Sequence, residues 1–577
     1  MKIDCDNKRI FWLLLIVACV TVIPFLGLAD FHTKGEPREA VVAYSMLESG
    51  DWVLPRNNGG EIPYKPPFFH WTVAAASVVT GGTVGEFSSR LPSALALMAM
   101  IMTGFVFYAR RKGQTVGLLA ALVSLTAFEL HRAGANCRVD MMLTALTVCS
   151  LCLFYRYYER GLKGVPWLAI LLMSCATLTK GPVGSVIPCL AFGVFLLLRG
   201  VNFFKAFGLL AAWGLASFIL PLCWYYAAWL DGGQEFLDLV MEENFGRMTN
   251  TMSYDSCVNP WHYNFLTLAG GYVPWILLVI LSLFSFKKIR QGIHLKAPGK
   301  VVGWLKNADP VDLFSAVCIF VIFLFYCFPQ SKRSVYLMPI YPFIAYFVAR
   351  YMIYLVNVKS KAVKIYGSVL AVLGVLLTVA VLLVKLGCVP ESMFTGRNAA
   401  QDIAMMREIK NIGGLWAVFL LVPFILGILW FRFMRRERGY DVRYLYAICI
   451  LTFGIYIALD GAILPRVLNA KSKQPVAMAI DRIAPASSGN LYEFIEEGEL
   501  AAGDPVHFFE LNFYLGDRIA NFRKCNPSDG YLLITDTDAA NYLPRFAEEG
   551  YRFIPLYTSC RAVLHRQPVQ LYSFTRE

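Results

Sequence analysis

The sequence predicts a polytopic α-helical membrane protein that carries a small α/β domain at its C-terminal end. Of the 577 residues, 57% are hydrophobic and only 16% are charged, and the mean hydropathy is +0.53. A soluble domain rarely reaches this apolar content. The apolar residues also gather in blocks of about 20, the length that a helix needs to cross roughly 30 Å of hydrocarbon.

About thirteen transmembrane helices are expected from these blocks. The first block follows a basic N-terminus and is too long for a typical signal core, so we expect an uncleaved span there. A shorter apolar stretch, Phe68 to Val79, is bounded by glycine and is expected to form an interfacial helix. The expected spans lie near residues 10–29, 90–109, 115–133, 139–158, 165–180, 183–198, 206–228, 264–286, 310–328, 335–355, 364–386, 414–433 and 444–464.

Basic residues predict the orientation of these spans. They alternate to the loops on one side, which is also the side of the N-terminus, and the positive-inside rule makes that side cytoplasmic. The clusters are Arg110 to Lys112, Arg156 to Lys163, Arg199 with Lys205, Lys287 to Arg290, Lys359 to Lys364, and Arg435 to Arg438. An odd number of spans then places the C-terminus outside. Because topology accounts for these charges, the net charge of +13 does not predict a nucleic-acid partner.

Two domains are expected. Residues 1–464 would form the transmembrane domain, with an outer loop at 30–90 that includes interfacial helices, and residues 465–577 would form an α/β domain outside the membrane. The tail alternates short apolar runs, typical of strands, with a polar helical stretch. The runs are Pro505 to Phe509, Tyr531 to Thr535 and Val569 to Phe574, and the helical stretch is Asp538 to Gly550.

Several motifs of soluble enzymes are missing. The sequence contains no phosphate-binding loop of the nucleotide hydrolases, no dinucleotide-binding fingerprint and no zinc-protease motif. An enzyme that faces the outside has no ready supply of nucleotides. Its activated substrates would instead be linked to lipids and delivered within the membrane.

Ionisable side chains near membrane depth cost free energy, so those that are present are expected to have a functional or structural role. In this sequence they gather at the predicted outer ends of the spans. The five clusters are the first outer loop with Gly35-Glu36-Pro37-Arg38-Glu39 and Tyr64-Lys65-Pro66-Pro67, then Arg138-Val139-Asp140, Thr179-Lys180-Gly181-Pro182, Glu242-Glu243-Asn244-Phe245-Gly246-Arg247, and Ser331-Lys332-Arg333-Ser334-Val335-Tyr336.

Taken in order, the five clusters resemble the aminoarabinose transferases of lipid A modification, glycosyltransferase family 83. That family belongs to the GT-C superfamily, as do the protein O-mannosyltransferases. The resemblance covers nearly the whole chain. It implies an inverting transfer of a sugar from an undecaprenyl-phosphate carrier to a lipid A-like lipid, a glycan or a protein. The reaction would take place at the outer face of the bacterial inner membrane, with the C-terminal domain in the periplasm.

The residue types suit this reaction. The leaving lipid phosphate gains negative charge in the transition state, which nearby cations stabilise, and the acceptor hydroxyl needs a general base. The best carboxylates for the base are Glu36 and Asp140. The residues expected to bind the donor phosphate or the substrates are Arg38, Lys65, Arg138, Lys180, Glu243, Arg247, Lys332, Arg333 and Tyr336.

The first loop departs from the family pattern at one position. Aminoarabinose transferases typically have Asp-Glu before the Arg of this loop, whereas here Gly35 precedes Glu36. Either Glu36 takes over the role of the missing Asp, or Asp30 reaches in from the start of the loop. The departure also leaves the identity of the sugar open.

Other hypotheses remain. A flippase for lipid-linked sugars would place ionisable groups near the bilayer midplane, in broken helices, and an assembly or sensor protein would use the outer tail to bind a partner. An enzyme resembling O-mannosyltransferases or O-antigen ligases is a third alternative. No cofactor is required, although His70, His131 and His262 could bind a divalent metal together with a carboxylate. Structural roles are also open, such as helix capping by Asp140.

Overall fold

The computed structural model describes residues 5–63, 65–243, 258–283, 308–396, 398–437, 439–496, 507–560, 563 and 567–577. The chain divides into two compact units. The first comprises Met1–Leu28, Arg90–Leu222 and Asn259–Ala470, and the second comprises Ala29–Ser89, Cys223–Val258 and Lys471–Glu577. The second unit thus groups the expected outer loop with the C-terminal tail, a grouping that the predicted domains 1–464 and 465–577 did not include.

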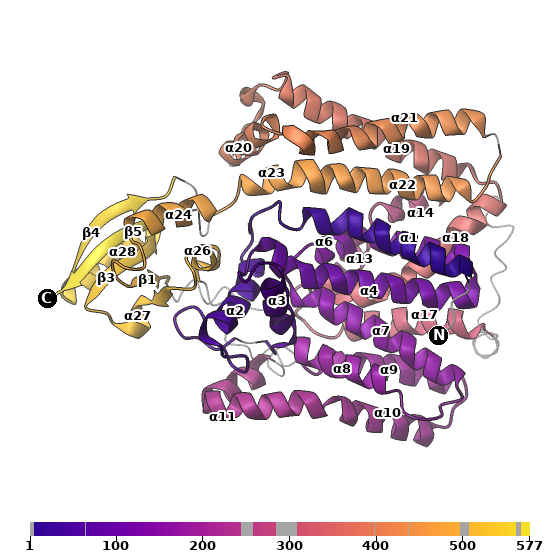
Figure 1. Ribbon diagram of the computed structural model, residues 1–577, viewed down its shortest axis with the longest axis horizontal. Coiled ribbons are helices and arrows are strands. Elements are labelled where there is room, and N and C mark those ends of the chain that lie inside the picture. The colour runs from indigo at the N-terminus through magenta and orange to yellow at the C-terminus, as the bar shows by residue number, and fades with distance from the viewer. Residues whose placement is uncertain are drawn as a thin grey trace. The chain divides into compact units, whose positions relative to one another are not determined.

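The first unit is a bundle of helices that run largely side by side (Figure 1). Its core is aromatic and aliphatic; for example, the rings of Tyr108 and Tyr346 stack with their centroids 4.3 Å apart. The helices are α1 (Cys5–Val22), α4 (Glu86–Lys112), α5 (Gln114–Leu125), α6 (Phe128–Gly134), α7 (Val139–Glu159), α8 (Trp167–Lys180), α9 (Val183–Leu198), α10 (Phe203–Ser217), α11 (Ile219–Met241), α13 (Tyr263–Gly271), α14 (Trp275–Leu283), α17 (Pro310–Phe325), α18 (Tyr341–Asn357), α19 (Lys361–Lys385), α20 (Ala399–Lys410), α21 (Leu421–Arg436), α22 (Arg443–Ala458) and α23 (Leu464–Asn469). The division between the units falls within α4 and α11.

Short turns of other helix types complete this unit. They are η1 (Ile23–Phe25), η4 (Ser334–Ile340), η5 (Glu391–Met393), η6 (Gly414–Leu420) and the π-helical turn η7 (Leu459–Ile463). The π-helical turn lies between α22 and α23. Such turns are frequently found at functional sites.

The prediction of a multi-pass helical membrane protein is confirmed. Among the described residues, eight helices are long and apolar enough to cross a membrane, and the number rises to ten if each of two bent helix pairs is one span. Three further expected spans correspond to α8, α9 and α17, which have 14, 16 and 16 residues and are shorter than the other spans. The expected count of thirteen therefore stays a prediction.

The third and eighth expected spans are broken, contrary to the prediction of continuous helices. The third expected span divides into α5 and α6, which meet at an angle of 67°. The eighth divides into α13 and α14, which meet at 102°. Pro274, which cannot donate a backbone hydrogen bond, lies in the second break. Residues at the two breaks are hydrogen-bonded to each other. The Phe128 N–H donates to the Val273 carbonyl at 2.9 Å, and Trp275 Nε1 donates to Thr126 Oγ1 at 3.0 Å. These bonds satisfy polar groups that lipid could not.

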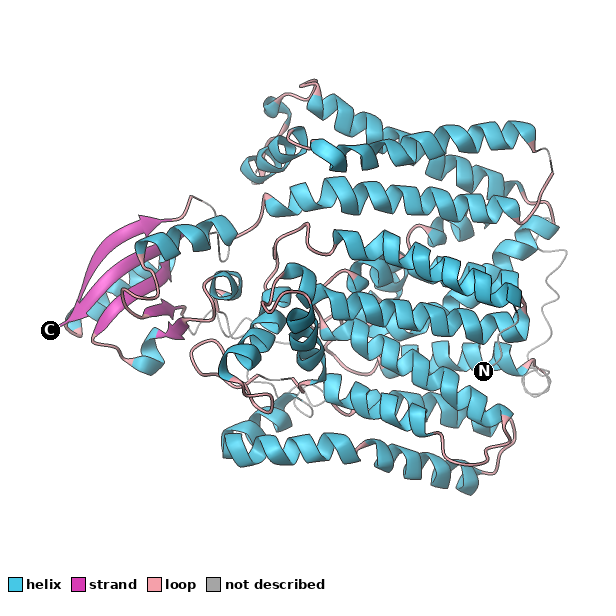
Figure 2. Cartoon of the chain, in the orientation of Figure 1, coloured by secondary structure: helices cyan, strands magenta, loops and turns pink. Residues whose placement is uncertain are grey.

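The second unit contains all the β-strands that the structure describes, gathered in one sheet (Figure 2). The strand order is β2-β1-β3-β5-β4, in which β1 is parallel to β2 and β3, and β5 is antiparallel to β3 and β4. The strands are β1 (Leu491–Phe494), β2 (Ile519–Asn521), β3 (Asp529–Thr535), β4 (Tyr551–Thr558) and β5 (Val569–Arg576), and the helices are α2 (Gly35–Ser49), α3 (Phe68–Val79), α24 (Gln474–Ile483), α26 (Phe509–Tyr514), α27 (Phe522–Cys525) and α28 (Asp536–Glu548).

The tail is α/β as expected, although one of its three apolar runs was misread. Phe509 begins α26 rather than ending a strand, while residues 505 and 506 lie outside the described residues. The side of the membrane on which the tail lies stays a prediction.

Within the second unit, hydrogen bonds join the segment 29–89 to the tail. Asp517 accepts from Ser45 Oγ at 2.6 Å and from the Asn58 N–H at 2.8 Å. Tyr514 donates from its hydroxyl to Glu86 Oε1 at 2.7 Å. Asp517 has a left-handed backbone (φ 55°), and only Gly, Asn and Asp adopt this conformation routinely. The tail therefore fixes the position of α2, the helix that carries Glu36.

Candidate functional site

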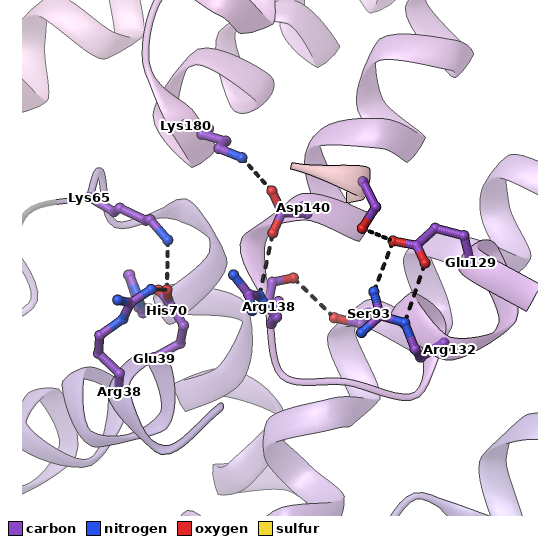
Figure 3. A network of polar contacts seen from close by, with 11 residues as sticks. Arg38, Glu39, Lys65, His70, Ser93, Glu129, Arg132, Arg138, Asp140 and Lys180 are labelled. Atoms are coloured by element: carbon purple, nitrogen blue, oxygen red, sulfur yellow. Dashed lines mark hydrogen bonds and ion pairs between the residues drawn. The ribbon is translucent and has the colours of Figure 1, made fainter. Parts of the chain in front are cut away.

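Asp140 lies in the first turn of α7, in the first unit. The helix begins there because Arg138, just before it, is extended (φ −148°, ψ 142°). The Asp140 side chain is buried, with 4% of the residue exposed. It accepts a short hydrogen bond from Lys180 Nζ, and Arg138 Nε lies 3.5 Å from its second oxygen (Figure 3). The carboxylate is thus held between two cations that the sequence had placed in separate clusters.

Lys180 is the last residue of α8. The helix ends here because Gly181 takes a positive φ of 81°, and Pro182 follows. Besides Asp140, Lys180 contacts an aromatic ring: its ammonium lies 4.5 Å from the ring centroid of Tyr336, within the range of a cation–π interaction. The structure therefore brings together Arg138, Asp140, Lys180 and Tyr336 from three distant segments.

Lys332 and Arg333 directly precede η4, the turn that carries Tyr336. Lys332 is buried, with 7% exposed. Its Nζ donates to the Asn259 carbonyl at 3.2 Å, and Asn259 Nδ2 donates to the Lys332 carbonyl at 3.0 Å. Arg333 is half-buried and extended. These two mutual hydrogen bonds hold the chain just before Arg333.

Glu129 is a buried carboxylate that the sequence analysis missed. It lies in α6, is 4% exposed, and accepts hydrogen bonds from Arg132 Nη2 at 2.8 Å and from Ser334 Oγ at 2.9 Å. Ser334 is the first residue of η4. The sequence signal that could have identified Glu129 was an acidic residue within an expected span, three positions before an arginine.

His131, one of the histidines considered as metal ligands, pairs with an acidic side chain. Its Nε2 lies 2.6 Å from Asp460 Oδ2 in the π-helical turn η7. Across the residues that the structure describes, no group of three or more His, Cys, Asp or Glu side chains is arranged to hold a metal ion.

A second cluster lies within the second unit, around Glu39 of α2. Glu39 is 3% exposed. Its Oε1 accepts from Lys65 Nζ at 2.7 Å, and its Oε2 accepts from His70 Nε2 at 3.0 Å. Arg38 Nη2 lies 3.4 Å from Oε1 (Figure 3). Lys65 and Arg38 were predicted site residues, whereas Glu39 had been assigned no role.

The charge state of Glu39 follows from these neighbours. Burial alone would raise the pKa of its carboxyl group, but Lys65, His70 and Arg38 together hold that pKa well below its ordinary value. Glu39 is therefore an anion at neutral pH.

The other predicted site residues are Glu36, Glu243 and Arg247. Glu36 is buried in the first turn of α2, with 2% exposed. Glu243 is half-buried just after α11. Arg247 lies outside the described residues. The catalytic and binding roles of the predicted set stay predictions.

Comparison with protein families matches one part of the chain. Residues 64–225 match the family described as dolichyl-phosphate-mannose-protein mannosyltransferase. This stretch contains Lys65, Arg138, Asp140 and Lys180.

Three relatives illustrate the range of sequence similarity. An uncharacterized protein of Aquifex aeolicus is 28% identical, over 59% of this chain and 63% of the relative. An undecaprenyl phosphate-alpha-4-amino-4-deoxy-L-arabinose arabinosyl transferase of Proteus mirabilis is 23% identical, over 61% of each chain. A transferase of the same name from Edwardsiella ictaluri is 24% identical, over 88% of this chain and 86% of the relative. The chain thus matches somewhat less than two thirds of the length of the first two.

Solved structures extend the comparison to the fold. The crystal structure of ArnT from Cupriavidus metallidurans bound to undecaprenyl phosphate superposes with a TM-score of 0.69 at 19% identity, covering 99% of this chain and 98% of ArnT. The apo structure of the same protein gives the same TM-score. Sequence and fold together confirm the expected resemblance: this chain is similar to the undecaprenyl-phosphate aminoarabinose transferases over most of its length and has the fold of ArnT.

Proposed function

We propose that this protein is an integral-membrane glycosyltransferase that moves a sugar, with inversion, from a polyprenyl-phosphate carrier to a lipid, glycan or protein acceptor. The reaction takes place at the outer face of the bacterial inner membrane. The observation that carries the proposal is Asp140, a buried carboxylate held between Arg138 and Lys180.

The surroundings of Asp140 favour an anionic ligand. The side chains on or beside η4 form what we call the η4 cluster: Glu129, Arg132, Arg138, Asp140, Lys180, Lys332, Arg333 and Tyr336. Five of these are cations and two are carboxylates, so the cluster has a formal charge of +5 − 2 = +3. Such an excess stabilises a phosphate as it leaves the sugar, and the arginines can bind it through two parallel hydrogen bonds.

In the proposed reaction the acceptor oxygen attacks the anomeric carbon on the face opposite the phosphate. The bond from that carbon to the phosphate oxygen breaks, and the electron pair leaves with the polyprenyl phosphate. The proton of the acceptor hydroxyl passes to the Asp140 carboxylate. A positioned base of this kind contributes roughly 10²–10⁴-fold in rate.

The similar proteins support the donor class. Several relatives are named as undecaprenyl-phosphate aminoarabinose transferases, and the solved ArnT contains undecaprenyl phosphate. Both facts concern those proteins, and they agree with the excess of cations in the η4 cluster.

A second candidate, movement of lipid-linked sugars across the membrane, is favoured by one observation. Transporters build their sites from broken helices, and two expected spans of this chain are broken. Ionisable side chains also lie near these breaks, because Glu129 and His131 belong to α6.

The experiment that tests the proposal uses the purified full-length protein in vesicles with a labelled polyprenyl-phosphate sugar. Release of free polyprenyl phosphate is expected from the wild type and is expected to fall about 10²–10⁴-fold in Asp140→Asn. Asp441→Asn is the matched control, since Asp441 is an exposed carboxylate that also pairs with an arginine. Movement of the lipid without bond cleavage would favour the transporter instead.

A further inference from the structure

The two carboxylate oxygens of Glu39 bind two different side chains. Oε1 binds the Lys65 ammonium at 2.7 Å, and Oε2 binds His70 Nε2 at 3.0 Å. Both Glu39 and His70 are almost fully buried, at 3% and 1% exposed. A carboxylate tied on one side to a buried ring has little freedom to turn, so the direction of its other oxygen is fixed.

Lys65 is fixed on the backbone side as well. Pro66 and Pro67 follow it directly, and Pro67 is the residue before the first turn of α3. Two consecutive prolines fix two φ angles. His70 is the third residue of the same helix. The Lys65 ammonium is therefore held between a stiff backbone and the carboxylate of Glu39.

Glu39 and Gly35 lie on the same face of α2. In α2, Glu39 follows Gly35 by four residues, so the two positions are neighbours on one face of the helix. Helical side chains lean toward the N-terminus, so the side chain of Glu39 covers the turn that begins at Gly35. Glycine has no side chain to occupy that face.

We infer that Glu39 is a positioning residue, which holds the Lys65 ammonium in place for the donor phosphate. The inference rests on the proposed function, because it assumes that the ligand of Lys65 is a polyprenyl phosphate.

The inference has a physical basis in the donors of Lys65. An ammonium can donate three hydrogen bonds, so it can bind Glu39 and a phosphate oxygen at the same time. A hydrogen bond between two charged partners is roughly twice as strong as a neutral one. Replacing Glu39 by glutamine keeps the shape of the side chain but removes the charge that holds Lys65 in place.

The test measures two quantities on the full-length protein: the Kd of polyprenyl phosphate and the rate of its release from a polyprenyl-phosphate sugar. In Glu39→Gln, kcat/KM is expected to fall about 10–100-fold, because a misplaced catalytic group costs up to about 10²-fold, and the Kd is expected to rise. Adding Gly35→Asp to Glu39→Gln is expected to recover most of both losses. Glu48→Gln, which changes an exposed carboxylate of the same helix, is expected to change neither.

The possible outcomes separate the inference from the proposed function. Unchanged Kd and kcat/KM in Glu39→Gln would overturn the inference, as would a folded double variant that recovers nothing. If Glu39→Gln weakens the binding of polyprenyl phosphate, but the wild type releases polyprenyl phosphate from no carrier-linked sugar, the inference stands and the proposed function fails. A wild type that binds no polyprenyl phosphate overturns both. Thermal unfolding of each variant checks that it is folded.

Discussion

His507 links the segment 29–89 to the tail within the second unit, and the effect of its charge on stability can be worked out in numbers. The ring is 7% exposed. Its Nε2 lies 2.9 Å from Glu61 Oε2, and its Nδ1 makes a short hydrogen bond to Glu493. Burial alone would lower the pKa of His507, but Glu493 and Glu61 raise it to about 10. Burial alone would raise the pKa of Glu61, but His507 and Lys524 lower it to about 2.

The size of the effect follows from the difference between folded and unfolded states. An unfolded histidine has a pKa near 6.5, so at pH 7.5 it is mostly neutral, whereas folded His507 is charged. At 1.36 kcal/mol per pH unit, the proton stabilises the folded state by about 3 kcal/mol at pH 7.5. This contribution is complete below pH 6.5 and is lost as the pH rises through 10.

The perturbation is His507→Gln, and the assay is a short subtilisin pulse in increasing urea, with the intact tail detected through a C-terminal tag. The variant is expected to lose about 3 kcal/mol of unfolding free energy at pH 7.5 and almost none at pH 10.5. A loss of equal size at both pH values would refute the reasoning, since it would show that shape rather than charge matters. His262→Gln, at an exposed histidine, is the control.

Three further outcomes are expected. Gly271→Ala should destabilise the first unit by about 1–3 kcal/mol, because its Cβ would overlap the Tyr341 hydroxyl; an unchanged thermal midpoint would contradict this packing. Asp517→Ala should lower the unfolding free energy of the second unit by about 2–4 kcal/mol in the protease assay, since it removes several charged hydrogen bonds. Asp517→Asn should cost less, because asparagine tolerates the left-handed backbone. Lys180→Gln should lower kcat/KM about 10²-fold without shifting the thermal midpoint by more than a few degrees, as expected for a partner of Asp140; full activity would remove Lys180 from the site.

Much of the helical architecture could be predicted from the sequence, because the length of an apolar block determines whether it can span a membrane. The breaks could not. Proline is tolerated within transmembrane helices, so Pro274 alone did not indicate a bend of 102°. The partners that stabilise the break, such as Thr126 for Trp275, lie 149 positions apart in the chain.

The candidate site, too, could be predicted from the sequence only in part. Asp140, Lys180 and Tyr336 were each identified from local motifs, but their contacts depend on packing between three separate segments. Glu39 was missed because residues 30–90 were expected to form a loop with interfacial helices, whereas only the helix α2 makes residues 35 and 39 neighbours on one face. Glu129 was missed because its partner Ser334 lies 205 residues away.

The make-up of the second unit has a consequence for synthesis of the chain. Ser45 and Asp517, which bind each other, are 472 residues apart, and ribosomes add about 5–20 residues per second. Roughly half a minute to a minute and a half separates the emergence of the two. During that time the nascent chain carries Lys65 and Glu39 without the tail that supports them, so a chain whose translation stops early has no complete second unit.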